Sequence, residues 1–276
     1  NTWIQWCPGC GNYGILMAVK NALAKSKCKP EETVIVSGVG CHGKIPHYLK
    51  TYGFETLHGR PLPVATGIKL ANHKLKVLAF SGDGDGYGIG MCHFVHTMRR
   101  NIDITYIVHD NAIYGLTTGQ TSPTSEKGYK SPSTPHGAIE YPVNPIALAL
   151  ADHATFVARG YAGDVKHLEE IIYQGIKHKG VALIDVLQPC VSFNKINTYQ
   201  FYQERVYKLE EDGHDVTDFD QANKKAWEWG KRIPIGIFYQ VARPTYEEQL
   251  PQLAKAALRD QAIDSIDIKK IMKQFS

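Results

Sequence analysis

A glycine-rich, acidic turn between two apolar segments constrains this chain more than any other feature. The turn, Gly82–Gly86, reads Gly-Asp-Gly-Asp-Gly; it follows the apolar run Lys76–Phe80 and precedes the segment Ile89–Arg100. We interpret the run as a buried strand and the later segment as a helix. A second apolar run, Ile104–Val108, follows that helix. This order predicts parallel strands whose following turns meet at the carboxyl edge of one sheet, where open α/β sheets bind ligands.

Oxygen ligands for a hard cation follow these two strands. The topology would bring Asp83 of the glycine-rich turn beside Asn111, which follows the second run. A carboxylate, an amide oxygen and a backbone carbonyl, which we assign to Ile113, make half of an octahedral shell. Mg²⁺ usually completes such a shell with phosphate oxygens and water. The pair therefore predicts a diphosphate held through Mg²⁺.

The main alternative to a metal-held diphosphate is a dinucleotide-binding turn. Gly86–Gly90 offers such a glycine pattern, but alone it is a weak signal. Without a cation, the charges of Asp83 and Asp85 would repel a pyrophosphate. A Gly-Asp-Gly sequence followed one βα unit later by an Asn resembles the signature of thiamine-diphosphate enzymes. We therefore expect thiamine diphosphate and Mg²⁺ at this site.

Four of the six cysteines predict a metal cluster. Cys7 and Cys10 form a C-x-x-C pair, whereas Cys41 and Cys190 each follow a predicted strand and would reach the same sheet edge. Four thiolates from separate segments suit an iron–sulfur cluster, while structural zinc would more often use two local pairs. Disulfides are the other alternative, disfavoured because no secretory segment is visible and the cysteines are widely spaced. The remaining two lack partners by spacing and are expected to be ordinary residues: Cys28 and a buried Cys92.

Composition limits the class of protein without identifying it. A length of 276 residues with 43% hydrophobic residues allows one large α/β domain with an appendage. A net charge of +4 does not favour a nucleic-acid partner. No apolar run reaches the length of a membrane span, so we expect a cytoplasmic protein with no membrane partner. The sequence begins at Asn1 rather than Met, which fits a short leader missing from it.

The motifs together resemble the β subunit of a 2-oxoacid:ferredoxin oxidoreductase. The resemblance rests on segments in the family's order: Trp6–Asn12, Gly38–Cys41, Thr56–Arg60, Gly82–Asp85, Asn111–Thr117 and Leu187–Cys190. It implies thiamine-dependent oxidative decarboxylation of a 2-oxoacid to an acyl-CoA and CO₂. Electrons would pass one at a time through a [4Fe–4S] cluster, held by the four cysteines, to ferredoxin. The same parts would serve reductive carboxylation in reverse.

Several residues are assigned to the site on this basis. Lys44, three residues after Cys41, would stand beside the reactive end of the cofactor and favour 2-oxoglutarate over pyruvate. The alternative, that Lys44 is an ordinary surface lysine without contact to substrate, is equally compatible with the sequence. Leu116 would line the cleft above the metal, and we assign it with Lys44 to catalysis. Cofactor contacts are expected from Val39, Gly40, Cys41, His42, His58, Gly82, Gly84, Asp85, Gly115, Leu116 and Thr117.

The chain has room for only half of a thiamine site, the half that binds the pyrophosphate. The resemblance implies that an α subunit supplies the pyrimidine half and the activating glutamate, in an αβ or (αβ)₂ assembly. We expect residues 1–190 to form the catalytic domain and 191–276 a C-terminal extension over the cluster or a partner, with helices at Gln221–Arg232 and Tyr246–Ser276. Residues 119–144, rich in Ser, Thr, Pro and Gly, are predicted to form a long loop.

Three other functions stay open at this point. A pyruvate-type oxidoreductase would use the same cofactors. A thiamine-dependent decarboxylase or ligase could keep the cysteines for a structural metal, which a visible spectrum would separate from a cluster. An electron-transfer subunit would not bind thiamine diphosphate. Calorimetry with thiamine diphosphate and Mg²⁺ would separate this alternative from the others.

Overall fold

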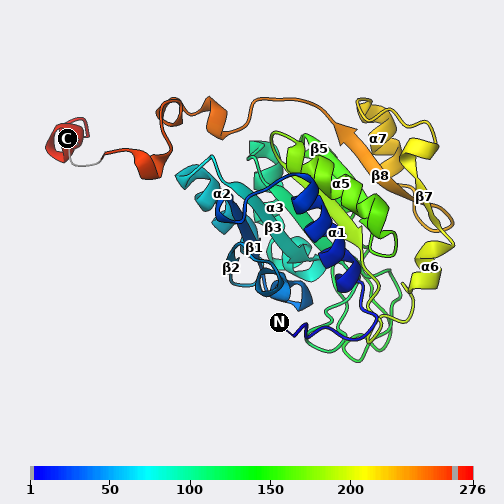
Figure 1. Cartoon of the computed structure of the whole chain (residues 1–276). Coiled ribbons are helices and arrows are strands. Elements are labelled where there is room, and N and C mark those ends of the chain that lie inside the picture. The colour runs from blue at the N-terminus through cyan, green and yellow to red at the C-terminus, as the bar shows by residue number, and fades with distance from the viewer. Residues whose placement is uncertain (1–2, 263–266, 276) are drawn as a thin grey trace.

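A central sheet of eight strands organises the molecule (Figure 1). The computed structural model describes residues 3–262 and 267–275. Neighbouring strands are parallel except for the pair β5–β8. In spatial order the strands are β2 (Tyr52–Glu55), β1 (Thr33–Ser37), β3 (Lys76–Gly82), β4 (Thr105–Asp110), β6 (Ala182–Leu187), β5 (Phe156–Tyr161), β8 (Ile233–Gln240) and β7 (Val206–Lys208). The predicted α/β fold with a mostly parallel sheet is confirmed.

Helices cover both faces of the sheet because its central strands are apolar on both sides. Val77 and Ala79 of β3 belong to one core cluster, whereas the alternate residues Leu78 and Phe80 belong to the other. α1 (Asn12–Lys25) and α5 (Val165–Lys177) contribute to the second cluster. The helices that contribute to the first are α2 (Pro61–Ala71), α3 (Met91–Arg100), α4 (Pro145–Ala151) and α7 (Phe219–Ala226).

Three strands lack the continuous apolar run from which the other strands are predicted. β2 is an edge strand with every residue exposed, and β7 has only three residues, so neither forms an apolar run. β8 contains Pro234 and also Gly236, whose φ of +124° few other residues adopt. β7 and β8 bring the chain after residue 190 into the same sheet as the residues before it.

The two helices predicted near the C-terminus are wrong in extent. α7 ends at Ala226 rather than Arg232, and the described part of Tyr246–Ser276 holds only short helical pieces. A proline at position 251 and the lack of a sustained apolar face explain why no long helix forms. The pieces are the 3₁₀ turns Glu247–Gln249, Pro251–Leu253 and Leu258–Asp260, and α8 (Ile268–Met272); residues 263–266 and 276 lie outside the described residues.

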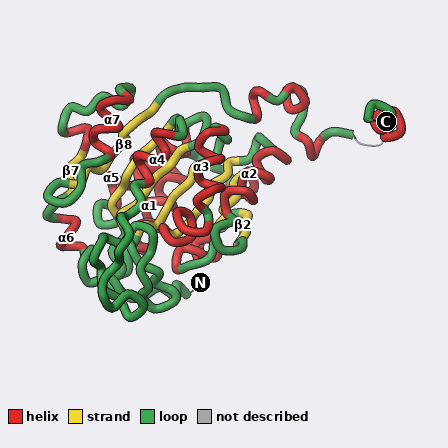
Figure 2. Tube along the Cα trace, turned by 180° about the vertical axis from the view of Figure 1, so that it is seen from behind, coloured by secondary structure: helices red, strands yellow, loops and turns green. Residues whose placement is uncertain are grey.

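The C-terminal segment runs along the amino edge of the sheet. The Tyr246 N–H donates to the Asn101 carbonyl, and Glu247 accepts from the N–H of Asp103, both just before β4. From there the chain continues past α2 and away from the body (Figure 1 and Figure 2). The segment just after residue 190, which includes α6 (Tyr199–Gln203), lies near the carboxyl edge, as do Trp227 and Trp229, which line a pocket with Asp110 at the end of β4. Within the residues that the structure describes, no helix is long and apolar enough to span a membrane.

Candidate active site

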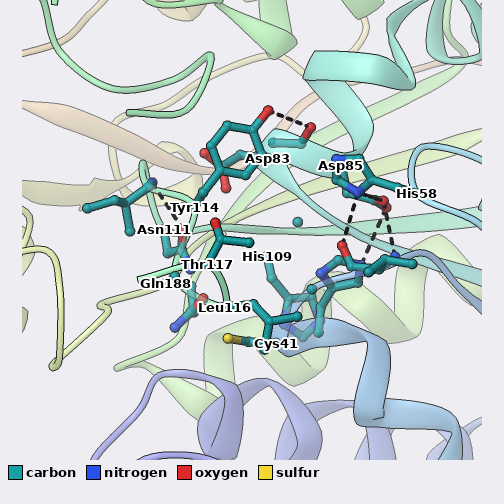
Figure 3. Close-up of a pocket in the computed structure, with 17 residues that line it drawn as sticks. Cys41, His58, Asp83, Asp85, His109, Asn111, Tyr114, Leu116, Thr117 and Gln188 are labelled. Atoms are coloured by element: carbon teal, nitrogen blue, oxygen red, sulfur yellow. Dashed lines mark hydrogen bonds and ion pairs between the residues drawn. The ribbon is translucent and has the colours of Figure 1, made fainter. Parts of the chain in front are cut away.

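A cavity of about 360 Å³ lies at the carboxyl edge of the sheet (Figure 3). Its walls come from the ends of β1, β2, β3, β4 and β6 and the segments that follow them. The lining residues are Val39, Gly40, Cys41, His42, His58, Gly82, Asp83, Gly84, Asp85, His109, Asn111, Ile113, Tyr114, Gly115, Leu116, Thr117 and Gln188. The structure thus brings together every residue predicted to contact the diphosphate cofactor or Mg²⁺. The individual contacts remain predictions.

Strand register places the two predicted metal ligands in this cavity. β3 and β4 are parallel, with Gly82 opposite His109, so Asp83 and Asn111 emerge from neighbouring strand ends. The Ile113 N–H donates to Asn111 Oδ1 at 3.1 Å, which turns the chain back over the strand end. The Ile113 carbonyl accepts no hydrogen bond from the described residues. It is therefore free to act as a third oxygen ligand.

Asp83 is a buried carboxylate without a protein cation beside it. Its side chain is 2% exposed, and no Lys, Arg or His among the described residues forms an ion pair with it. Burial raises the pKa of Asp83 to about 6, although hydrogen bonds from Ser122 and Thr124 act in the opposite direction. A buried charge needs a partner charge. The carboxylate, the amide oxygen of Asn111 and the carbonyl of Ile113 therefore fit Mg²⁺ in donor type and charge.

Asp85, the second acid of the turn, holds loops together. Its Oδ1 accepts hydrogen bonds from Gly59 N at 2.7 Å and Val39 N at 3.1 Å, while His42 Nε2 lies 3.4 Å from Oδ2. Burial alone would raise the pKa of Asp85, but the contact with His42 and the Gly59 N–H hold it below its usual value. A Cβ on Gly38 would lie 1.9 Å from Asp85 Oδ2, so only glycine fits there. Asp85 thus shapes the cavity wall.

Three residues that line the cavity were not assigned to the site from the sequence: His109, Tyr114 and Gln188. His109, at the end of β4, is buried; its Nδ1 lies 2.7 Å from Asn12 Oδ1, and its Nε2 has no hydrogen-bond partner among the described residues. Burial, together with His42, lowers the pKa of His109 well below its usual value, so the ring is neutral. Gln188 donates from Nε2 to Cys10 Sγ at 3.3 Å. The sequence signal that could have identified His109 and Gln188 is the position of a polar residue directly after a buried apolar run.

A second cavity, of about 230 Å³, contains all four cysteines predicted to hold a cluster. Cys7 and Cys10 reach it from the N-terminal segment, where Cys10 N donates to Cys7 O at 3.0 Å. A Cβ on Gly115 would lie 3.7 Å from Cys190 Sγ and 3.8 Å from Cys41 Sγ, so both thiols lie close to the position that a side chain would take at this glycine. The topology therefore gathers thiols from three separate segments.

The thiols suit a soft, positively charged group. Burial raises the pKa of Cys10 to about 12 and that of Cys41 to about 11, with neighbouring cysteines adding to both shifts. Thiolates would persist here only next to a cation, and four of them suit iron and sulfide. Within the described residues, however, no three His, Cys, Asp or Glu side chains are already arranged to hold a metal ion, and no cysteine forms a disulfide.

Cys28 and Cys92 lie outside both cavities. Cys28 is partly buried, but the prediction that Cys92 is buried is wrong, since it is exposed on α3. That helix buries Phe94, Thr97 and Met98 on the face that packs against the sheet. A position two residues before Phe94 falls on the opposite, solvent-facing side.

Lys44 lies outside the cavity wall. It is exposed on a 3₁₀ segment, Cys41–Tyr48, and forms no hydrogen bond or ion pair with the described residues. Its neighbour Cys41 lines both cavities. Its predicted contact with substrate therefore stays a prediction, and its ammonium is available to a group outside this chain.

Comparison with known proteins agrees with the site. Residues 38–186 match the family model described as "Thiamine pyrophosphate enzyme, C-terminal TPP binding domain". Residues 190–255 match a second family model, that of the C-terminal part of the pyruvate ferredoxin oxidoreductase beta subunit. The first match covers every residue that lines the larger cavity except Gln188. Fold and site together therefore place the chain among the thiamine-diphosphate enzymes.

Individual relatives narrow this class. The chain is 51% identical over 269 residues to the 2-oxoacid:ferredoxin oxidoreductase subunit beta of Saccharolobus solfataricus, covering 93% of this chain and 88% of the relative. It is 36% identical over 249 residues to the 2-oxoglutarate synthase subunit KorB of Methanocaldococcus jannaschii, covering 90% and 92%. A solved 2-oxoglutarate:ferredoxin oxidoreductase from Magnetococcus marinus, with 2-oxoglutarate, coenzyme A and succinyl-CoA bound, has a TM-score of 0.91 at 38% identity, covering 100% and 94%.

The chain belongs to the family of 2-oxoacid:ferredoxin oxidoreductase β subunits. It is thus one subunit of a multi-subunit oxidoreductase, and an α partner is implied. The predictions of family, enzyme class and thiamine diphosphate as cofactor are confirmed.

Proposed function

We propose that this subunit, together with an α partner, converts 2-oxoglutarate and coenzyme A to succinyl-CoA, CO₂, a proton and two electrons, which pass singly to ferredoxin. The observation that carries the proposal is the shared wall of the two cavities. Cys41, Asn111, Gly115, Leu116 and Gln188 line both. Groups bound in the two cavities would be separated by single side chains, a short distance for electron transfer. The same residues would serve the reverse, carboxylating direction.

The residues of the larger cavity have separable tasks. Asp83, Asn111 and the Ile113 carbonyl would hold Mg²⁺ against the diphosphate. Bound thiamine diphosphate would supply the carbon nucleophile and electron sink that decarboxylation of a 2-oxoacid requires. Leu116, which is 57% exposed, lies between the two cavities and would shield the reacting carbon from water. These positioning tasks are this chain's share of the catalysis.

The cysteine cavity would hold a [4Fe–4S] cluster through Cys7, Cys10, Cys41 and Cys190. Support comes from the common cavity of the four thiols and from burial that disfavours free thiolates. When bound, the cluster would remove electrons one at a time. The α subunit would close the larger cavity, adding the pyrimidine half of the site and an activating glutamate. Both an αβ and an (αβ)₂ assembly satisfy this need.

The choice of 2-oxoglutarate rests on the relatives and on Lys44. KorB subunits and the Magnetococcus marinus enzyme carry 2-oxoglutarate in their names. An unpaired ammonium beside Cys41 could meet the distal carboxylate of a dicarboxylic substrate. Pyruvate is the second candidate, because the C-terminal family model is named for it. It would leave Lys44 without a carboxylate partner.

A substrate panel on the anaerobically purified αβ complex, with methyl viologen as acceptor, tests the proposal. We expect kcat/KM for 2-oxoglutarate to exceed that for pyruvate at least tenfold. A preference for pyruvate would overturn the substrate assignment. A colourless protein without iron would overturn the cluster, and Asp83→Ala that retains thiamine diphosphate would overturn the metal site.

A further inference from the structure

Acidic residues are missing from all the segments that surround the cysteine cavity. The chain contains 27 Asp and Glu residues, yet none falls within residues 3–30, 38–54, 111–125 or 186–203. These four segments supply every residue that lines the cavity. These segments are far apart in the sequence and meet only in the folded protein. The absence of Asp and Glu is therefore a feature of the region around the cavity and not of one stretch of the chain.

The cavity opens to solvent between apolar and basic groups. Some of the residues that line it are exposed, among them Cys7, Val191 at 36% and Phe193 at 37%. Lys195 Nζ donates to the Val191 carbonyl at 2.6 Å, which holds an ammonium beside a residue that lines the cavity. We call the surface formed by these four residues and Lys50 the acid-free rim.

Lys50 adds a second ammonium to this surface, from a segment that contacts the N-terminal residues lining the cavity. It is exposed two residues after Tyr48, whose ring centroid lies 5.0 Å from that of Trp6 and whose hydroxyl accepts from Gln5 N at 2.9 Å. Trp6 and Gln5 both line the cysteine cavity. Lys50 forms no hydrogen bond or ion pair with the described residues. Basic groups therefore come from two segments, one that lines the cavity and one that contacts its lining residues.

We propose that the acid-free rim is the docking surface for an acidic iron–sulfur electron carrier. The inference rests on the proposed function, since it needs a cluster in the cysteine cavity. A positive surface around an apolar centre attracts an acidic protein, raises its association rate and loses strength with salt. Small interfaces of this kind suit electron-transfer partners, which must also leave quickly. Of the four thiols in the cavity Cys7 is the exposed one, so a carrier bound at the rim would approach a cluster through Cys7.

The test compares charge-reversal variants of the complete αβ complex. Lys195→Glu and Lys50→Glu change the rim, and Lys224→Glu, on the exposed side of α7, is the matched control because it lines neither cavity. Binding of an acidic 2[4Fe–4S] ferredoxin is measured by calorimetry at low and high salt. Its KM as acceptor is measured beside that of methyl viologen, which needs no docking surface.

We expect each rim variant to weaken ferredoxin binding and raise its KM about tenfold, with a shallower salt dependence. Lys195→Arg should behave as wild type, as should Lys224→Glu. Methyl viologen kinetics should not change. Equal effects of rim and control variants would overturn the docking surface. If a rim variant released the α subunit, the rim would belong to the α interface and the docking surface would be overturned as well. If the wild-type complex did not reduce methyl viologen, the proposed function itself would be refuted.

Discussion

Thr124 Oγ1 lies 2.7 Å from Asp83 Oδ2, although Thr124 belongs to the long loop after β4 and Asp83 follows β3. The same oxygen lies 2.7 Å from Asp110 Oδ1, at the end of β4. All three side chains are buried. The hydroxyl therefore links the two strand ends that bear the proposed Mg²⁺ ligands. It fixes the direction in which the Asp83 carboxylate points.

Replacing this hydroxyl should weaken the diphosphate site. Thr124→Val keeps the shape of the side chain and removes the hydroxyl that lies between two buried carboxylates, a loss of about 1–3 kcal/mol. We expect thiamine diphosphate with Mg²⁺ to bind about tenfold more weakly in calorimetry, with the visible spectrum of the cluster unchanged. Thr121→Val, in the same loop and without a hydrogen bond to the described residues, is the control. Equal affinity in the two variants would show that Asp83 is positioned by other groups.

The role of Thr124 also shows how far the sequence could predict this site. The residues around Asp83 and Asn111 were predictable because a parallel βα unit brings its strand ends to one edge whatever the loops do. Residues 119–144 were predicted as a loop, and the described fold agrees apart from isolated bridges. Which loop residue meets Asp83 depends on how the loop folds back, which no periodicity encodes.

Other errors have equally physical origins. The cysteine cavity was predictable because Cys41 and Cys190 follow buried strands. Three strands were missed because edge position, short length or backbone irregularity removes the apolar pattern, as in β2, in β7 and in β8 with Gly236. A long helix was also predicted over Tyr246–Ser276, where the described residues form only short helical pieces. Without a surface to pack on, such a segment gains too little to form a long helix.

Iron content should depend on four cysteines and not on the other two. Cys190→Ser removes one of the four thiols of the cysteine cavity, so we expect most iron and the visible absorption to be lost. Cys28→Ser and Cys92→Ser, outside the cavity, should keep both. Iron per chain, measured on anaerobically purified complex, decides the matter. If Cys28→Ser lost iron while Cys190→Ser retained it, the fourth ligand would be misassigned.

Acid should destabilise the fold through His178. Burial lowers the pKa of His178 to about 4, and its Nε2 lies 2.8 Å from Thr155 Oγ1. Because the unfolded chain takes up this proton near pH 6.5, the native state keeps its full stability above that pH. It loses stability as the pH falls toward 4, by up to about 3 kcal/mol.

Urea unfolding at pH 7 and pH 4.5, followed by tryptophan fluorescence, measures this loss. In His178→Gln the residue no longer titrates, so the variant should lose less stability between the two pH values than wild type. His136→Gln, on an exposed loop, is the control and should follow wild type. Identical pH dependence in all three proteins would show that His178 is not held neutral.

Substrate choice should depend on the charge of Lys44. If its ammonium meets the distal carboxylate of 2-oxoglutarate, that charge-assisted hydrogen bond contributes about 1.5–3 kcal/mol, or about ten- to a hundredfold in discrimination. Lys44→Ile should therefore lower kcat/KM for 2-oxoglutarate by that factor while sparing or improving pyruvate. Lys50→Ile, six residues further along the chain, changes the charge equally and should leave the ratio unaltered. An unchanged ratio in Lys44→Ile would place this lysine outside the substrate site. Specificity would then lie with the Leu116–Thr117 wall or with the α subunit.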